Sequence, residues 1–142
     1  MYIVNSYIHQ IYTAANINIC ANQDKKYMSG ENGGPAESLL VALNIRRNSA
    51  KVLIYMACHG EATSDDLESA LGIGQPSVSA AIKDLDGLGW LTTEQMRSDT
   101  KGRPKHKYRL SKAFEAIADE IERMARNRIS EIEDGLKHLR LA

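Results

Sequence analysis

The sequence predicts a mainly α-helical fold with one small β-hairpin, in the α+β class. Three observations support this prediction. Two short helical segments flank a glycine-containing turn, an alternating basic segment follows them, and a long segment with apolar residues at intervals of three and four ends the chain. With 142 residues, of which 43% are hydrophobic, the chain is expected to form one compact domain with an appendage.

Residues 1–36 are expected to be an N-terminal extension and a linker. Residues 1–27 contain five Ile and four Tyr but no Leu, Gly, Pro, Arg or Glu, all of which occur in the rest of the chain. Two interpretations remain open for them. They are either a translated leader ahead of a natural start at Met28, or an arm whose apolar helical face embraces a partner subunit. The Gly33-Gly34-Pro35 sequence is typical of a linker.

Residues 37–111 carry the signals of a small helical module. A short helix is expected over 37–43, followed by a helix over 49–59 that Asn48 caps. The second of these is apolar almost all round, as is typical of a central buried helix. Gly60 is expected to end it.

Two further helices are expected on either side of a tight turn. Thr63 provides a hydroxyl cap for the first, and Gly72 suits the left-handed position at its end. The second covers about Gln75–Leu85, with Pro76 in its first turn, where the missing N–H has no cost. Its apolar stripe is expected to be buried, which leaves polar side chains and Lys83 facing outward.

A basic β-hairpin is expected after these helices. Its strands cover 90–94 and 106–110, and the turn-forming residues 98–104 make its tip. Strand alternation turns Tyr108 inward and Lys107 and Arg109 outward. The window 97–109 holds six basic residues and one acid, although the net charge of the chain is zero. Positive charge this localised favours a polyanionic partner.

Helix, turn, helix and basic hairpin in this order predict a winged helix-turn-helix. The order of motifs over about residues 37–111 resembles that of TrmB-like archaeal regulators and of MarR- and ArsR-type winged helices. The segments that carry the resemblance are Leu43-Asn44-Ile45, Ala50–Leu53, Gly60–Ser64, Leu71–Ser79, Leu88–Leu91 and Gly102–Ser111. The resemblance implies a dimeric transcription factor with its second helix in the major groove and its wing near the minor groove.

The expected function is therefore that of a homodimeric, sequence-specific regulator that binds double-stranded DNA. The recognition helix is about Gln75–Leu85, and the basic wing Arg97–Arg109 is expected on phosphates or in the minor groove. Base readout is expected from the amide and hydroxyl groups of the helix, and a phosphate contact from Lys83. Ala80 departs from many relatives, which have a basic residue there. The candidate DNA-binding residues are Gln75, Pro76, Ser77, Ser79, Ala80, Lys83, Lys101, Arg103, Lys105, Lys107 and Arg109.

Residues 112–142 are expected to form one long dimerisation helix, capped by Ser111 and ending at about Leu141. Its apolar stripe is too long to be buried entirely by its own module, which favours a two-fold dimer. The alternative is a helix folded back on its own core. The candidate dimer-interface residues are Phe114, Ile117, Ile121, Met124, Ile129, Ile132, Leu136 and Leu139.

Other functions find little support in the sequence. No nucleophile-elbow or phosphate-loop motif is present, so no enzyme and no cofactor are expected. The four histidines lie far apart and the Cys-x-Cys pair of ArsR-type proteins is absent, so no metal site is expected. Without a secretory signal or a membrane-spanning run, a cytoplasmic location is expected. The alternative function is a winged-helix protein-interaction module in a larger assembly, without direct DNA binding.

Overall fold

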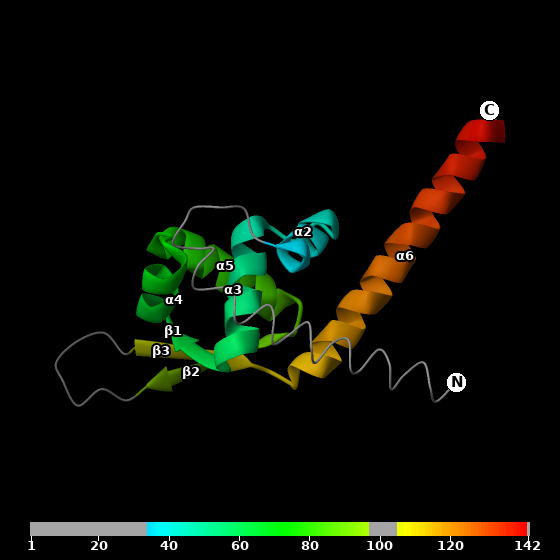
Figure 1. The fold of residues 1–142 in the computed structure, drawn as a ribbon. Coiled ribbons are helices and arrows are strands. Elements are labelled where there is room, and N and C mark those ends of the chain that lie inside the picture. Colours follow the sequence, from blue (N-terminus) through cyan, green and yellow to red (C-terminus); the bar gives the residue numbers. More distant parts are fainter. Residues whose placement is uncertain (1–33, 97–104, 142) are drawn as a thin grey trace.

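The computed structural model describes residues 34–96 and 105–141 (Figure 1). The interpretations of residues 1–27, the hairpin tip and its cations Lys101 and Arg103 lie outside the described residues. The elements are α2 (Pro35–Ala42), α3 (Arg47–His59), β1 (Glu61–Thr63), α4 (Ser64–Leu71), α5 (Gln75–Gly87), β2 (Leu91–Met96), β3 (Lys105–Leu110) and α6 (Phe114–Leu141). This order confirms the predicted fold class, a winged helix-turn-helix followed by a long helix.

Helix α3 is the centre of the module, as its apolar sequence predicts. It packs against α2, α4 and α5, and it buries residues on several sides, including Val52, Leu53 and Met56. Its start differs from the prediction, because Arg46 occupies the N-cap position and Asn48 lies inside the first turn. Helix α2 begins at Pro35, inside the segment expected to be a linker.

The N-terminal cap of α4 and the turn between α4 and α5 follow the predicted pattern. The Thr63 hydroxyl accepts the Asp66 N–H at 3.2 Å, and the Asp66 carboxylate accepts the Thr63 N–H at 2.9 Å. This capping box satisfies two N–H groups at the start of α4. Gly72 follows α4 with φ +63°, a left-handed conformation that glycine adopts without strain. Pro76 lies in the first turn of α5.

The strands form an antiparallel sheet in the order β1-β3-β2, so the hairpin has a third strand that the sequence analysis did not predict. Ala62 of β1 and Thr93 of β2 both lie opposite Tyr108 of β3. Tyr108 is buried, as predicted, and its hydroxyl lies 3.2 Å from the Ser64 hydroxyl of α4. The sheet is therefore fixed against the start of α4.

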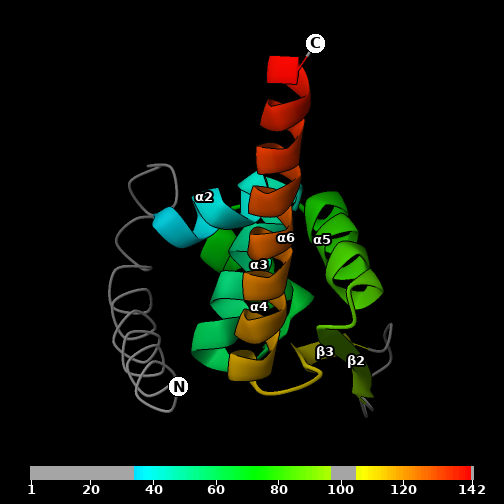
Figure 2. The ribbon, with the colours of Figure 1, turned by 90° about the vertical axis from the view of Figure 1, so that its right-hand side faces the viewer.

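Helix α6 begins in the module and projects far beyond it (Figures 1 and 2). Its 28 residues make a rod of about 42 Å. Ser111 does not cap it, because the Ser111 hydroxyl donates instead to the Gly89 carbonyl at 2.6 Å. The indole N–H of buried Trp90 donates to the Glu120 carboxylate at 2.5 Å. This bond and the burial of Ile117 anchor the first turns of α6 on the module.

Candidate nucleic-acid interface

Helix α5 presents the side chains that were predicted to face outward. Its stripe of Val78, Ala81, Ile82 and Leu85 is buried, with Leu85 completely enclosed. On the other side, four candidate residues are exposed and two are half-buried. The exposed ones are Gln75, Pro76, Ser79 and Lys83, and the half-buried ones are Ser77 and Ala80.

The first turn of α5 carries no negative charge. Its N-cap is Gly74, which has no side chain to accept a hydrogen bond, and its first turn contains no acid. The positive end of the helix dipole is therefore not neutralised locally, which favours an anionic partner near this end.

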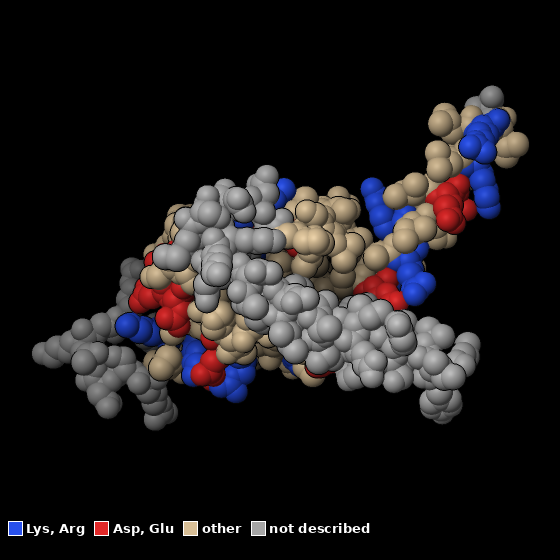
Figure 3. Space-filling view, in the orientation of Figure 1, with Lys and Arg blue, Asp and Glu red and all other residues tan. Residues whose placement is uncertain are grey.

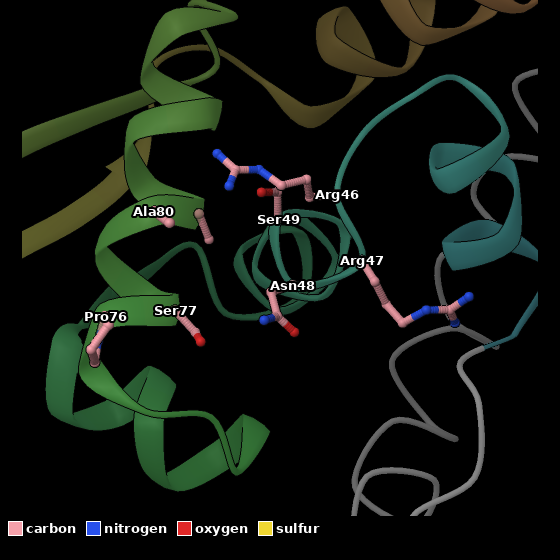
Figure 4. A pocket seen from close by; sticks show the side chains of 8 residues that line it. Arg46, Arg47, Asn48, Ser49, Pro76, Ser77 and Ala80 are labelled. Atoms are coloured by element: carbon pink, nitrogen blue, oxygen red, sulfur yellow. The ribbon is translucent and has the colours of Figure 1, made fainter.

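A cavity of about 340 Å³ lies between this end of α5 and the first turn of α3 (Figure 4). In Figure 4, the Ser77 side chain of α5 points toward Asn48 of α3 across the opening. The lining residues are Arg46, Arg47, Asn48, Ser49, Pro76, Ser77, Ala80 and Ala81. The residues of α3 were not among the candidates predicted from the sequence, although two adjacent arginines before an asparagine were a visible signal.

An ion pair fixes α5 against α3 at this cavity. The Arg46 guanidinium donates Nε–H to Oδ2 of Asp84 at 2.7 Å and Nη2–H to Oδ1 at 2.6 Å. The hydroxyl of buried Ser49 donates to the same Asp84 carboxylate at 2.8 Å. The hydrogen bonds from Arg46, and then that from Ser49, lower the pKa of Asp84 below its ordinary value. Asp84 therefore sets the position of α5 on α3.

A second ion pair joins α3 to α2. The Glu37 side chain is completely buried, and its Oε1 accepts a hydrogen bond from Nη1 of Arg47 at 2.8 Å. The other carboxylate oxygen, Oε2, has no hydrogen-bond partner among the described residues. Arg47 is thus the compensating charge for a buried acid, in addition to lining the cavity.

The cations of the wing strands are paired with acids, which the sequence analysis did not foresee. Nζ of Lys107 lies 2.7 Å from Glu61 of β1, and Nη2 of Arg109 lies 3.5 Å from the same carboxylate. Arg109 also contacts Glu94 of β2 at 3.2 Å, while Lys105 lies 3.9 Å from Asp65 of α4.

The strand register brings the acids of β1 and β2 beside the cations of β3. Glu61 lies opposite Arg109 and diagonally from Lys107, and Glu94 lies diagonally from Arg109. Acidic and basic side chains are accordingly intermixed over the strands in Figure 3. The hydrogen bond from Lys107 lowers the pKa of Glu61, so this acid stays ionised at neutral pH. The base of the wing is therefore less cationic than its sequence predicts.

Helix α6 divides into a buried part and an exposed part, which narrows the expected dimer interface. Ile117 and Ile121 belong to the core of their own chain, and Phe114 and Met124 pack partly buried against it. The first turns of α6 therefore pack on the core of their own chain, and the expected dimer role of these four residues stays a prediction. Beyond them, exposure rises sharply. The exposed fractions are 56% for Ile129, 53% for Ile132, 52% for Leu136 and 73% for Leu139.

Within 34–96 and 105–141, no group of three or more His, Cys, Asp or Glu side chains is arranged to hold a metal ion. No helix of this part of the chain has the length and apolar character needed to cross a bilayer.

Solved structures share this fold at low sequence identity. A possible transcriptional regulator from Methanosarcina mazei Go1 superposes with a TM-score of 0.58 and 19% identity, over 72% of this chain and 86% of that one. TrmBL2, an archaeal chromatin protein, superposes with a TM-score of 0.51 and 17% identity, over 74% of this chain and 39% of its own length. The disulfide form of AbfR superposes with a TM-score of 0.50 and 17% identity, over 98% of this chain and 93% of that one.

The family comparison is more specific than the fold. No curated protein sequence matches this chain. The model of the family described as "Sugar-specific transcriptional regulator TrmB" matches residues 39–114, more than half of the chain. That match covers the second half of α2, helices α3 to α5, the sheet and the connection from β3 to α6. The chain belongs to the TrmB family of transcriptional regulators.

Proposed function

We propose that this protein is a homodimeric regulator that binds double-stranded DNA sequence-specifically, with α5 in the major groove. The observation that carries the proposal is the start of α5. This helix end has no side-chain cap and no acid in its first turn, and it presents exposed Gln75 and Ser79 beside Ser77. A helix with side chains is about 10–12 Å wide, and the major groove of B-DNA is about 12 Å wide.

Each exposed side chain of α5 has a role that follows from its chemistry. The Gln75 amide can donate to and accept from adenine at N7 and N6, and the hydroxyls of Ser77 and Ser79 can pair with several base edges. Lys83 lies farther along the exposed face, where its charge suits a phosphate. The small side chain of Ala80 lets the helix approach closely and contacts a thymine methyl group.

The wing supplies phosphate contacts that do not depend on sequence. We assign these mainly to Lys101, Arg103 and Lys105, at and beside the hairpin tip, and secondarily to Lys107 and Arg109. Non-specific duplex binding derives almost entirely from such contacts, so affinity should fall steeply as salt rises. TrmBL2, which shares the fold, is described as showing a novel mode of DNA binding, and this supports DNA as the partner class.

The exposed stripe of α6 is the proposed dimer interface. It consists of Ile129, Ile132, Leu136 and Leu139, each more than half exposed in the single chain. Four large apolar side chains on one face of a projecting helix are typical of a protein–protein contact. A two-fold pairing through this stripe would present two α5 helices to successive turns of a duplex. The cytoplasm is the location that fits this function.

Selection of bound duplexes from a random library tests the function directly. We expect one preferred sequence with two related half-sites. Gln75→Ala should relax the preference at particular bases, at about 1–3 kcal/mol for a good bidentate contact. Arg103→Ala should weaken all duplexes alike. The proposal is contradicted if the protein binds no duplex at about 50 mM salt, a result that would favour an interaction module instead.

The dimer is tested separately by sedimentation of the wild type and of Leu136→Glu. The wild type should sediment as a dimer and the variant as a monomer, because a carboxylate in the centre of the apolar stripe would be buried without a partner. A monomeric wild type would contradict this part of the proposal.

A further inference from the structure

We propose that Glu61 weakens the binding of the wing to DNA, because its carboxylate competes with DNA phosphates for Lys107 and Arg109. This inference rests on the proposed DNA-binding function. One acid of β1 would then oppose the attraction between the wing cations and DNA. The basic segment alone did not predict this strand.

The geometry gives Glu61 contact with both cations at once. Its Oε1 lies 2.7 Å from Nζ of Lys107, and its Oε2 lies 3.5 Å from Nη2 of Arg109. The three residues are on neighbouring strands, with Glu61 directly opposite Arg109 in the register. Lys107 is the more enclosed cation, since its side chain is 27% exposed whereas that of Arg109 is 47% exposed.

The electrostatic consequence concerns the charge available to a phosphate. Lys107 and Arg109 together carry two positive charges. The carboxylate of Glu61 lies at hydrogen-bond distance from Lys107 and offsets one of these charges. Glu94 of β2 lies opposite Lys107 in the register, and its Oε2 lies 3.2 Å from Nη2 of Arg109. A phosphate that approaches Lys107 must therefore displace the carboxylate of Glu61 or share the cation with it.

The substitution Glu61→Gln separates charge from shape. Glutamine keeps the size of the side chain and one acceptor oxygen, and it leaves Lys107 without an anionic partner in β1. If the released cation then contacts one additional phosphate, the salt slope of log K should steepen by about 0.9. At 0.1 M monovalent salt this corresponds to about eightfold tighter binding, and the gain should disappear as the salt approaches about 1 M.

The matched control is Asp134→Asn, which changes the net charge equally at an exposed position of distal α6. Affinity for one duplex of arbitrary sequence is measured by fluorescence anisotropy from about 50 to 300 mM salt. A thermal melt of each variant verifies that it is folded. We expect Glu61→Gln alone to bind more tightly with a steeper slope, and we expect the gain to be lost when Lys107→Gln and Arg109→Gln are added.

Two failures are distinguishable in this experiment. If the wild type binds duplex and folded Glu61→Gln has the same affinity and salt slope as Asp134→Asn, the role of Glu61 is refuted while the proposed function stands. If the wild type binds no duplex at about 50 mM salt, the proposed function fails and the role of Glu61 fails with it.

Discussion

Replacing Arg47 by methionine should destabilise the protein although Arg47 is a half-exposed residue. Its guanidinium is the ion-pair partner of Glu37, at 2.8 Å, and the side chain of Glu37 has no solvent exposure. Methionine retains most of the aliphatic length of arginine but removes the charge. The carboxylate of Glu37 would then remain buried between α2 and α3 without compensation.

The expected magnitude follows from the unequal exposure of the two partners. Exposed ion pairs contribute about 0–1 kcal/mol, whereas removal of one partner from a fully buried pair costs about 3–5 kcal/mol. With Arg47 48% exposed and Glu37 at 0%, we expect an intermediate loss of about 2 kcal/mol. For a chain of this size that loss lowers the melting temperature by about 8 °C.

Thermal and urea unfolding measure this loss against a matched control. Arg126→Met removes an arginine from an exposed pair with Glu122 on α6, and it should change stability by less than about 0.5 kcal/mol. The double variant Glu37→Met/Arg47→Met should recover most of the loss, since a buried ion pair can be replaced by apolar residues at little cost. The reasoning is refuted if Arg47→Met is as stable as Arg126→Met, or if the double variant is no better than the single one.

Three further predictions concern stability. Thr63→Ala removes one half of the capping box of α4 and should cost about 1 kcal/mol in urea unfolding; an unchanged midpoint would contradict the role of the cap. Ile117→Ala should cost about 3 kcal/mol, because Ile117 is completely buried in the core of its own chain; a loss below about 1 kcal/mol would show that α6 does not belong to the core. The pKa of Asp84 is lowered by Arg46 and Ser49, so its ionised form stabilises the fold. That stabilisation is present above the ordinary pKa of 3.8 and is lost as the pH falls through the lowered folded value. Urea unfolding between about pH 6 and pH 2 should show this loss in the wild type and a smaller one in Asp84→Asn, and equal losses would contradict it.

Local sequence signals were sufficient to predict the elements whose boundaries depend on single residues. Gly72 and Pro76 marked the turn between α4 and α5 because each has a backbone preference that acts without its neighbours. The outward set of α5 followed from helical periodicity, which the buried Val78 and Leu85 confirm. Such signals are contained within one segment of the chain, and the sequence alone therefore predicts them.

The features that could not be predicted from the sequence depend on contacts between distant segments. Strand β1 has three residues, too few for its alternation to predict a strand, and it forms by pairing with β3. The pairing of Glu61 with Lys107 follows from that register and was not accessible before it was known. In α6, the same three-and-four periodicity continues from buried Ile117 to exposed Leu139, so the pattern alone cannot show where the core ends.

The most direct test of the central claim is dimethyl sulfate interference on a selected duplex, because guanine N7 is accessible in the major groove. If α5 of each subunit enters that groove, methylation should block binding at two clusters of guanines about one helical turn apart. In Gln75→Ala, the selected sequence should lose its preference at a position within each cluster. A duplex that is bound with full affinity despite methylation of every guanine N7 would contradict the placement of α5 in the major groove.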